Sequence, residues 1–458
     1  MTLLTKAPRG TADVLPDESY KRKFVEDVLI DCAEDADFKE IRTPVFEHTE
    51  LFKRSVGETT DVVQKEMYTF EDNGRRSITL RPEGTAGCAR AFLEHGLFNE
   101  PLPQKYFYLT SCYRYEKPQA GRLREFHQFG VETLGSDSPA ADAEIIALAR
   151  HIFDMFEIDD ISLEINSIGC PECRKKYHAE LKKYFEERKD RLCETCLTRL
   201  EKNPMRILDC KSPVCQEIAK GAPVMLDFLC EDCKAHFEKV KKYLNAMQID
   251  YTVNPRIVRG LDYYTNTVFE FVSTRIGAQG TVCGGGRYNG LIKELSGDSI
   301  PACGFGMGIE RLMLLIKAKG KELPPDKKPI IYIIPASEDY SFEAMRIVNE
   351  LREAGVYAIT DLGSRSIKAQ MKYANKRNAV YTAVLGGDEI GSRTLSVKKM
   401  ESGEKIDFEL DTFVDDFAEL AVDALFENVL GGADGLFDDD DGSSGANPFL
   451  SLLNGGKK

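Results

Sequence analysis

The chain has 458 residues, of which 42% are hydrophobic and 30% are charged, a composition typical of a globular protein with two or three domains. No apolar run is long enough to cross a bilayer and the N-terminus lacks the apolar core of a secretory signal, so we expect a cytoplasmic protein and no membrane partner. The net charge of -14 argues against non-specific binding to polyanions, although a local basic patch could still bind nucleic acid.

The N-terminal part predicts a loop, a helix and a short strand. Residues 8–17 contain two prolines and a glycine, and residues 19–33 then follow a helical pattern. Residues 38–52 predict a strand that breaks at Pro44. This could be an edge strand stopped by its proline, and other interpretations depend on motifs further along the chain.

The segment 78–95 predicts a strand that turns into a helix between Arg81 and Thr85. Glu83 lies in this turn, where the dipole of the following helix favours a negative charge. The simplest interpretation of Glu83 is therefore an N-terminal cap.

Residues 105–132 predict two antiparallel strands joined by a loop at KPQAG. Because side chains alternate along a strand, one face of this hairpin carries Arg114, Glu116, Arg122, Phe126, Gln128 and Glu132. An amphipathic hairpin with a charged outer face would explain the pattern. A functional site is favoured because an aromatic ring stands among arginines, carboxylates and an amide, and guanidinium groups bind phosphate oxygens.

A helix at 140–156 and a strand at 161–170 precede a cysteine-rich segment, which we assign to an inserted helical module at 171–250. Eight of the thirteen cysteines form four pairs there: Cys170 with Cys173, Cys193 with Cys196, Cys210 with Cys215, and Cys230 with Cys233. The first two pairs have the spacing of a four-cysteine zinc ribbon, and the last two could form a second site. Reduced thiols on helices are the alternative to zinc.

Two segments rich in glycine and aromatic residues follow, at 258–271 and 277–292. A tight turn would explain the glycines, but it does not explain Arg287 and Tyr288 directly after them. The glycines at 302–316 do not fit the GxGxxG spacing of a dinucleotide-binding turn. Arg311, on the helix that follows, could simply pair with Glu310 or another neighbour.

A polar linker at 318–328 leads to alternating strands and helices, which predict an α/β domain. Its second helix carries Lys368, Lys372 and Lys376 at intervals of four, with Arg365 and Arg377 nearby, although most basic faces are only solvated. Residues 429–458 are rich in Gly, Asp and Ser and predict a disordered acidic tail.

Several of these segments resemble the class II aminoacyl-tRNA synthetases. RxE, a loop and RxxxF resemble motif 2, the segment 38–52 with its break at Pro44 resembles motif 1, and GxGxG followed by GIER resembles motif 3. RGLDYYTxTVFE and GGGRYxGL resemble the two signature segments of the histidyl-tRNA synthetases. The resemblance covers nearly the whole chain up to about residue 428.

The resemblance implies an α+β catalytic domain at 1–325 with an antiparallel sheet flanked by helices, the helical insertion, and an anticodon-binding α/β domain at 329–428. Motif 1 implies a homodimer. The implied activity joins L-histidine to its tRNA through a histidyl-adenylate, with Mg²⁺ accompanying ATP and zinc possible in the insertion.

The family's functional residues carry over onto matching positions. The ATP-binding residues would be Arg114, Glu116, Arg122, Phe126 and Arg311. Arg259 and Arg114 would be catalytic. The histidine-binding residues would be Glu83, Thr85, Gln128, Glu132, Tyr263, Tyr264 and Tyr288. In the last domain, Arg365 and the three lysines would contact RNA near the anticodon.

A catalytically silent paralogue that regulates the first enzyme of histidine biosynthesis is the main alternative. Such a protein would be expected to lose parts of RGLDYY or GGGRY and to lack the C-terminal domain, and this chain retains both. An ATP-binding sensor of uncharged tRNA is disfavoured because no partner domain is fused to the chain.

Overall fold

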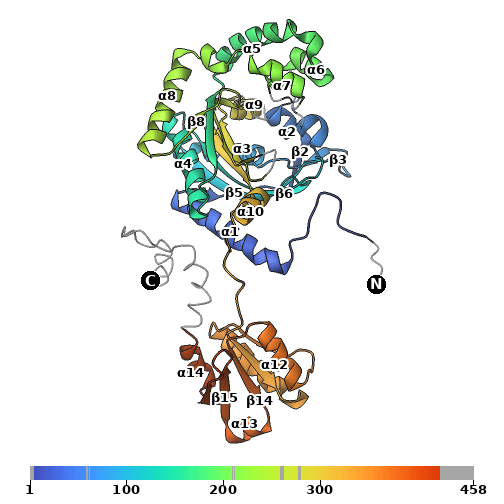
Figure 1. Cartoon of the computed structure of the whole chain (residues 1–458), viewed down its shortest axis with the longest axis vertical. Coiled ribbons are helices and arrows are strands. Elements are labelled where there is room, and N and C mark those ends of the chain that lie inside the picture. Colours follow the sequence, from blue (N-terminus) through green and yellow to red (C-terminus); the bar gives the residue numbers. More distant parts are fainter. Residues whose placement is uncertain are drawn as a thin grey trace. The chain divides into compact units, whose positions relative to one another are not determined.

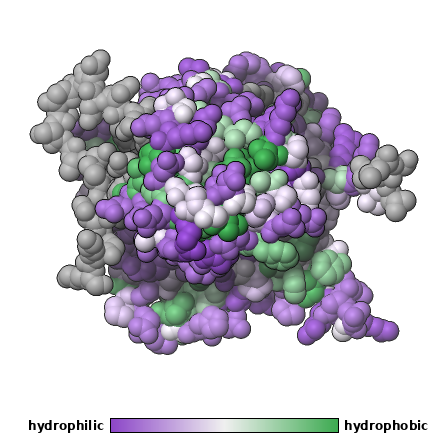
Figure 2. Space-filling view, turned by 90° about the horizontal axis from the view of Figure 1, so that it is seen from below, coloured by the Kyte–Doolittle hydropathy of each residue, from purple (hydrophilic) through white to green (hydrophobic). Residues whose placement is uncertain are grey.

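The computed structural model describes residues 5–57, 60, 62–208, 210, 212–257, 263–276 and 280–422. The chain divides into two compact units, Met1–Glu322 and Leu323–Lys458, and each is described by itself (Figure 1). Within the described ranges, no helix combines the length and the apolar composition that a membrane span requires. The face in Figure 2 is mostly hydrophilic, with hydrophobic residues in small groups, as is ordinary for a protein surface.

The first unit is built on an eight-stranded sheet in the order β1-β5-β6-β11-β10-β9-β7-β8. Its strands are β1 (Lys39–Glu40), β5 (Gln104–Tyr113), β6 (Glu125–Leu134), β7 (Ser162–Ser167), β8 (Thr252–Val253), β9 (Thr265–Val272), β10 (Thr281–Arg287) and β11 (Ala302–Gly308). From β5 to β7 in this order all neighbours pair antiparallel, whereas the edge strands β1 and β8 pair parallel. The predicted antiparallel sheet is confirmed.

Helices flank this sheet (Figure 1). They are α1 (Pro16–Asp35), α3 (Thr85–Glu94), α4 (Pro139–Met155), α9 (Leu291–Ser296) and α10 (Ile309–Ala318). The start of α4 shows why such a helix forms where it does: Pro139 occupies the first turn, and the Ser138 hydroxyl accepts the N–H of Ala140 at 3.2 Å. Its inner side buries Ile145, Ile152 and other apolar residues.

A second, three-stranded sheet has the order β2-β4-β3, with β2 (Phe46–His48), β4 (Ser77–Leu80) and β3 (Thr69–Glu71). The strand predicted over 38–52 is therefore wrong in part: β1 ends before Pro44, β2 begins after it, and α2 (Thr49–Val56) follows. The physical reason is the spacing of Phe52 and Val56, which are four residues apart and both fully buried on one side of the helix.

The cysteine-rich segment is helical. It consists of α5 (Pro171–Glu186), α6 (Glu194–Lys202), the 3₁₀ turn η4 (Pro204–Ile207), α7 (Pro213–Lys220) and α8 (Glu231–Ala246), between β7 and β8. Buried Leu181, Phe185 and Leu200 give the segment an apolar interior, which is continuous with the core under the central sheet.

The second unit has a five-stranded sheet in the order β13-β12-β14-β15-β16. The strands are β12 (Ile331–Pro335), β13 (Ala358–Thr360), β14 (Tyr381–Leu385), β15 (Thr394–Lys399) and β16 (Lys405–Glu409), and the helices are α11 (Ser341–Glu353), α12 (Ile367–Lys376), α13 (Gly387–Ser392) and α14 (Phe413–Leu420). β12 pairs parallel with β13 and β14, while β15 and β16 are antiparallel. The predicted α/β domain is confirmed.

Candidate active site

Two adjoining cavities lie over the central strands of the first unit. The large cavity has a volume of about 620 Å³ and the small cavity about 270 Å³. Residues from the hairpin and from β10 and β11 line both: Arg114, Glu116, Arg122, Gln128, Gly284 and Gly306. Four of the six residues on the predicted hairpin face therefore lie on the wall that the two cavities share, while Phe126 lines the small cavity alone and Glu132 lines neither.

Glu83 lines the large cavity from the turn before α3. Its Oε2 accepts the N–H of Thr85 at 2.7 Å and its Oε1 accepts the N–H of Ala86 at 2.9 Å. Burial raises the pKa of Glu83, and the two N–H donors act in the opposite direction. The expected helix cap is thus present, and the same bonds hold the carboxyl group at the cavity.

Tyr263 and Tyr264 line the large cavity as well, and their ring centroids are 4.7 Å apart. Thr85 lies on the α3 side, with its hydroxyl 3.4 Å from that of Tyr108. A carboxylate beside hydroxyls and aromatic rings can bind an ammonium group together with a small ring that carries N–H donors.

Glu132 lies behind this cavity and is 1% exposed. The hydroxyl of Tyr108 donates to its Oε1 at 2.9 Å, and the hydroxyl of Tyr288 donates to its Oε2. Burial raises the pKa of Glu132 to about 8, against the effect of the hydroxyl donors. Glu132 and Tyr288 therefore form a second layer of polar groups under the tyrosines that line the cavity.

Tyr108 lines the large cavity but was missed as a site residue from the sequence. A Cβ at Gly84 would come within 2.2 Å of its ring, and one at Gly130 within 2.4 Å. The signal that could have identified it is the cross-strand pair, since Tyr108 lies opposite Gly130 in the hairpin. The two glycines leave the space that the ring needs.

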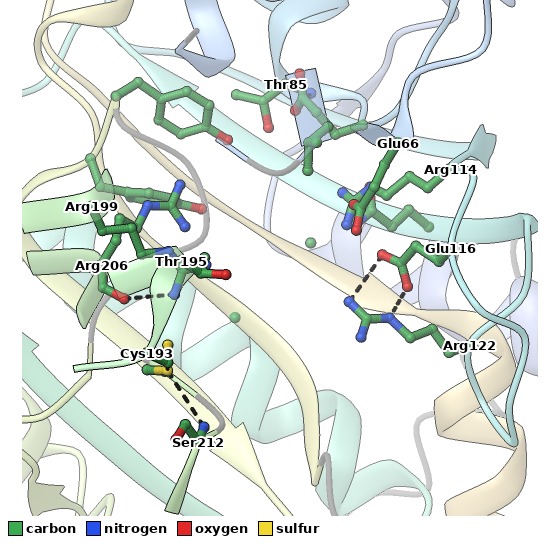
Figure 3. Close-up of a pocket in the computed structure, with 18 of the residues that line it drawn as sticks. Glu66, Thr85, Arg114, Glu116, Arg122, Cys193, Thr195, Arg199, Arg206 and Ser212 are labelled. Atoms are coloured by element: carbon green, nitrogen blue, oxygen red, sulfur yellow. Dashed lines mark hydrogen bonds and ion pairs between the residues drawn. The ribbon is translucent and has the colours of Figure 1, made fainter. Parts of the chain in front are cut away.

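The small cavity holds the other hairpin residues. Arg114 donates from Nε to the carbonyl of Pro82 at 2.8 Å, and its guanidinium carbon is 5.1 Å from the centroid of the Phe126 ring. Arg122 and Glu116 form an ion pair, drawn in Figure 3, in which Nη2 is 3.0 Å from Oε1. The groups that would face a nucleotide therefore lie close together here.

Arg311 lines the small cavity from the first turn of α10. Its Nε donates to the carbonyl of Gly121 at 3.1 Å. Burial lowers the pKa of Arg311, and the nearby positive charges of Arg122 and Arg114 lower it further. Three guanidinium groups, two from the hairpin and one from α10, thus repel one another at one cavity, which is an arrangement that a polyanion would stabilise.

The pairing of Arg311 with Glu310, which the sequence left open, is not what the structure has. Glu310 instead lies 2.7 Å from Nδ1 of His127 and accepts the backbone N–H of the same residue at 3.0 Å. Arg311 and Glu310 are adjacent on α10, and adjacent helical residues project to different sides.

Gln128 lies between the two cavities on β6, opposite Thr110. The thiol of Cys112 lies 3.6 Å from its Oε1, and a Cβ at Gly306 would come within 3.0 Å of its Nε2. The glycine of β11 therefore leaves room for the amide beside the next strand.

Arg287 does not belong to the site, although its neighbour Tyr288 touches Glu132. It is fully buried, and its Nε lies 3.0 Å from Oδ2 of Asp142. Its Nη1 and Nη2 donate to the carbonyls of Ser136 and Ser138 at 2.6 and 3.0 Å. Arg287 ties β10 to the start of α4, so the glycine-rich end of β10 carries a structural arginine next to Tyr288.

Some predicted residues lie elsewhere. Arg259 and the tail at 429–458 are outside the described residues. Lys368, Lys372 and Lys376 are exposed on α12 of the second unit. Arg365 is held by Asp361 at 2.5 Å, with its guanidinium carbon 4.1 Å from the Tyr373 ring centroid.

The eight cysteines of the insertion form two clusters, but not in the predicted pairing. The first cluster is Cys170, Cys173, Cys230 and Cys233, and the second cluster is Cys193, Cys196, Cys210 and Cys215. Within each cluster the sulfur atoms lie within 4.8 Å of one another. The first pair joins the fourth and the second joins the third, because the chain folds back on itself in the helical insertion.

Both clusters include cysteines at the N-termini of helices. Cys170, Cys193 and Cys230 each precede the first residue of a helix, where a negative charge is stabilised. The N–H of Cys230 donates to Cys173 Sγ at 3.0 Å, and that of Cys193 donates to Cys215 Sγ at 3.3 Å. Such backbone donors lower the pKa of a thiol, whereas burial raises the pKa of Cys173, Cys196, Cys210 and Cys233. Four cysteine sulfurs in each cluster are nevertheless a ligand set that suits Zn²⁺.

The pKa of the Cys193 thiol is lowered to about 7, because the backbone N–H of Cys196 and the neighbouring thiols outweigh its partial burial. The same causes, with Cys173 and Cys233, lower the pKa of Cys170 to about 7. A thiolate is therefore accessible in each cluster near neutral pH.

The insertion also forms a wall of the large cavity, which the sequence did not predict. The wall residues are Cys193, Thr195, Arg199, Arg206, Cys210 and Ser212. In Figure 3, Cys193, Thr195, Arg199, Arg206 and Ser212 lie across the cavity from Thr85, Glu66 and Arg114. Cysteine spacing marks Cys193 and Cys210 as possible metal ligands, but no local sequence signal marks the other four, because only the fold brings the second cluster over the central sheet.

Comparisons with known proteins agree with this architecture. Residues 10–312 match a family model described as histidyl-tRNA synthetase, and residues 331–420 match one described as anticodon binding domain. A histidine–tRNA ligase of Clostridium novyi is 55% identical over 91% of this chain and 99% of its own length. A histidine–tRNA ligase of Caldanaerobacter subterraneus is 53% identical over 89% of this chain and 98% of its own length.

Solved structures give the same result. The apo histidyl-tRNA synthetase of S. aureus has a TM-score of 0.78 and 40% identity, over 91% of this chain and 100% of the other. A Bacillus halodurans structure, described as an ATP phosphoribosyltransferase regulatory subunit/histidyl-tRNA synthetase, has a TM-score of 0.58 and 23% identity, over 81% of this chain and 97% of the other. At that identity it shares the fold only.

Proposed function

Because the chain belongs to the histidyl-tRNA synthetase family, we propose that its large cavity binds histidine and its small cavity binds ATP. The chain is an enzyme that ligates histidine to tRNA, and it is not the regulatory paralogue. One observation supports the assignment of the cavities: an acid, a threonine and two tyrosines line the large cavity, three arginines line the small cavity, and the two cavities share a wall.

In the histidine site, the α-ammonium group binds Glu83 and the hydroxyl of Thr85. The two bonds from the start of α3 hold this carboxylate in place before the substrate arrives. Tyr264 contacts the imidazole, and Gln128 contacts the carboxylate end of histidine. Tyr263 packs beside them. Glu132 accepts a ring N–H once Tyr108 or Tyr288 gives up its bond to that carboxyl group.

In the ATP site, adenine stacks on Phe126 and its amino group donates to Glu116. Since Glu116 is paired with Arg122, ATP binding replaces this ion pair with contacts to the nucleotide. Arg122 and Arg311 then hold the phosphates, and Mg²⁺ enters with ATP. The mutual repulsion of the guanidinium groups supports a site that is completed by an anion.

The chemistry has two steps. The histidine carboxylate attacks the α-phosphorus, pyrophosphate leaves, and the adenylate then transfers histidine to a ribose hydroxyl at the tRNA end. Arg114 and Arg259 stabilise the charge that develops on the α-phosphate, so catalysis depends on position and fixed positive charge, without a covalent enzyme intermediate. A wrong side chain would leave the buried polar groups unpaired, which is a strong form of discrimination.

The C-terminal domain, 329–428, binds the anticodon region. Three features support this: Arg365 and the exposed lysines of α12 form a basic side, the fold is of the anticodon-binding type, and exposed apolar side chains stand nearby in the chain. Phe342 is 86% and Leu362 is 82% exposed. They follow β12 and β13, which are neighbouring parallel strands. Both residues therefore lie towards the carboxyl ends of these strands, where unpaired bases could stack.

The active form is a homodimer, and it works in the cytoplasm, where tRNA is charged. The dimer forms through the motif 1 segment. Its strand β2 is the edge of the small sheet and presents Phe46, which is 56% exposed, next to Val45, which is 43% exposed. An open edge with apolar side chains is suited to pairing with a second copy.

Zinc occupies both cysteine clusters, with four thiolates in each. It supplies crosslinks that a small helical insertion with a limited core would need. Protein purified without chelator should contain two zinc ions per chain by elemental analysis, and only trace metal would refute the assignment.

Histidine-dependent exchange between ATP and pyrophosphate tests the catalytic proposal. The wild type should exchange, and Arg259→Ala should lower the rate by roughly 100- to 1000-fold with a smaller effect on ATP affinity, since one transition-state donor is removed. Arg256→Ala is the matched control, because that side chain holds the carbonyls of Lys220 and Ala222 in the insertion. Wild-type exchange by Arg259→Ala would refute the assigned role.

A further inference from the structure

The large cavity has two walls with different origins. The central sheet and α3 supply one wall, which includes Glu83, Thr85 and Tyr264. The helical insertion supplies the other, which includes Arg199 and Arg206 (Figure 3). The histidine and ATP contacts proposed above use only the first wall, so the function of the second wall is open.

The second wall carries positive charge in a form that suits phosphate. Arg199 lies on α6 and Arg206 on η4, and Nη1 of Arg199 donates to the carbonyl of Arg206 at 3.0 Å. Arg206 is only 9% exposed, so its guanidinium lies in a partly dry place where charge-assisted hydrogen bonds are strong. One guanidinium group can bind two oxygens of the same phosphate through two parallel N–H donors.

The two arginines lie between cysteines of the second cluster. Cys193 and Cys196 stand at the start of α6, before Arg199, and Cys210 follows soon after the η4 segment that carries Arg206. Cys193 Sγ and Cys210 Sγ are 3.7 Å apart, and the N–H of Ser212 donates to Cys210 Sγ at 3.4 Å. A metal that joins these thiolates closes the loop that bears both arginines and fixes its ends.

We propose that the second cluster is a positioning device for the active site: metal bound there holds Arg199 and Arg206 against the large cavity, where they bind phosphate groups of a substrate. This rests on the proposed function of the cavity. The phosphates come either from ATP or from the terminal nucleotides of tRNA. Arg114, Arg122 and Arg311 already face the nucleotide, so the tRNA end is the favoured source.

The first cluster has a different role, which makes it the internal control. Its cysteines line neither cavity. Cys233 Sγ lies 3.2 Å from Oδ1 of Asn266, on strand β9 of the central sheet. It attaches the insertion to the sheet. Arg199 and Arg206 lie within the long loop between Cys173 and Cys230, but along the chain both are much closer to the cysteines of the second cluster.

The test is a pair of double-mutant cycles. Arg199→Gln and Cys210→Ser should each raise the KM of one phosphate-bearing substrate about tenfold, which is the effect of removing one charge-assisted hydrogen bond. Combined, they should cost no more than either alone, because the cluster acts through the arginine. Cys230→Ser combined with Arg199→Gln should instead be additive.

Two assays separate the sources of phosphate. A raised KM for ATP in pyrophosphate exchange, which needs no tRNA, identifies the nucleotide. Unchanged exchange with a raised KM in tRNA charging, and weaker tRNA binding on filters, identifies the tRNA end. Zinc content should fall from two to one per chain in Cys210→Ser and in Cys230→Ser, and should stay at two in Arg199→Gln.

The proposal is overturned if the Arg199 and Cys210 effects add, or if Arg199→Gln and Arg206→Gln leave both KM values unchanged. Arg199→Gln keeps all eight thiols, so its result does not depend on the folding of a cysteine variant. Failure of the proposed function would be distinct, since the wild type itself would then show no histidine-dependent exchange.

Discussion

Glu132 is the residue whose charge state has the clearest consequence. Burial raises its pKa from 4.5 to about 8, so the protein holds a proton on Glu132 at neutral pH before histidine binds. The folded state therefore binds more protons than the unfolded state between these two values. The contribution of Glu132 to stability is greatest below pH 4.5 and falls as the pH rises towards 8.

Histidine binding should release this proton. If the carboxylate accepts a ring N–H, binding at pH 7 should release close to one proton, and the affinity should rise with pH until about 8 and then level off. Titration calorimetry in two buffers with different heats of ionisation measures the number of protons. Glu132→Gln is the control and should lack this release; equal proton release by both proteins would contradict the role.

At the scale of single residues, the sequence predicted which side chains share a face of the hairpin, but it did not predict how deeply each side chain is buried. Arg114, Gln128 and Glu132 project to one side of the hairpin as the alternation requires. However, Glu132 lies beneath Tyr108 and Tyr288, because burial depends on strands β10 and β11 that pack from elsewhere. Arg287 shows the same limit, since only the fold brings Asp142 to it.

Among the elements, helix α12 carries the most direct test of the RNA assignment. Lys368→Gln with Lys372→Gln should weaken tRNA binding and lower the slope of log affinity against log salt by about 0.7 for each phosphate that is no longer neutralised. The exchange reaction should not change. Lys239→Gln with Lys242→Gln removes the same charge from exposed positions of α8 and is the matched control. Equal weakening in the two variants would contradict a specific contact at α12.

Helices and strands could be predicted where the hydrophobic residues follow a single period. The central hairpin, α4 and the alternation of the C-terminal domain follow from hydrophobic spacing alone. β15 and β16 were missed, because charged residues fill their exposed positions and only Leu395 and Val397 are buried on β15. The cysteine spacing indicated the ligands but not their partners, which depend on how α5 to α8 fold back.

For the whole molecule, the assembly of two chains can be tested at the edge strand β2. Phe46→Asp should weaken the dimer by about 100-fold, since an unpaired charge in an apolar interface costs about 3 kcal/mol. Sedimentation over a range of concentrations measures this. Phe342→Asp makes the same change at an exposed phenylalanine of the second unit and should leave the assembly intact. A Phe46→Asp protein that sediments like the wild type would place the interface elsewhere.

The path of the chain through the insertion has a consequence for how this enzyme is built. β7 and β8 are parallel neighbours, and α8, which packs on α4, connects them as an ordinary crossover would (Figure 1). The chain enters the segment α5, α6 and α7 at Cys170 and leaves it at Cys230. The first cluster therefore joins the two ends of this segment where it meets the central sheet. The segment α5 to α7 is thus an addition to a sheet whose strands are already connected through α8. It can change its length, its charge or its reach over the cavity without disturbing a single strand of the sheet beneath it.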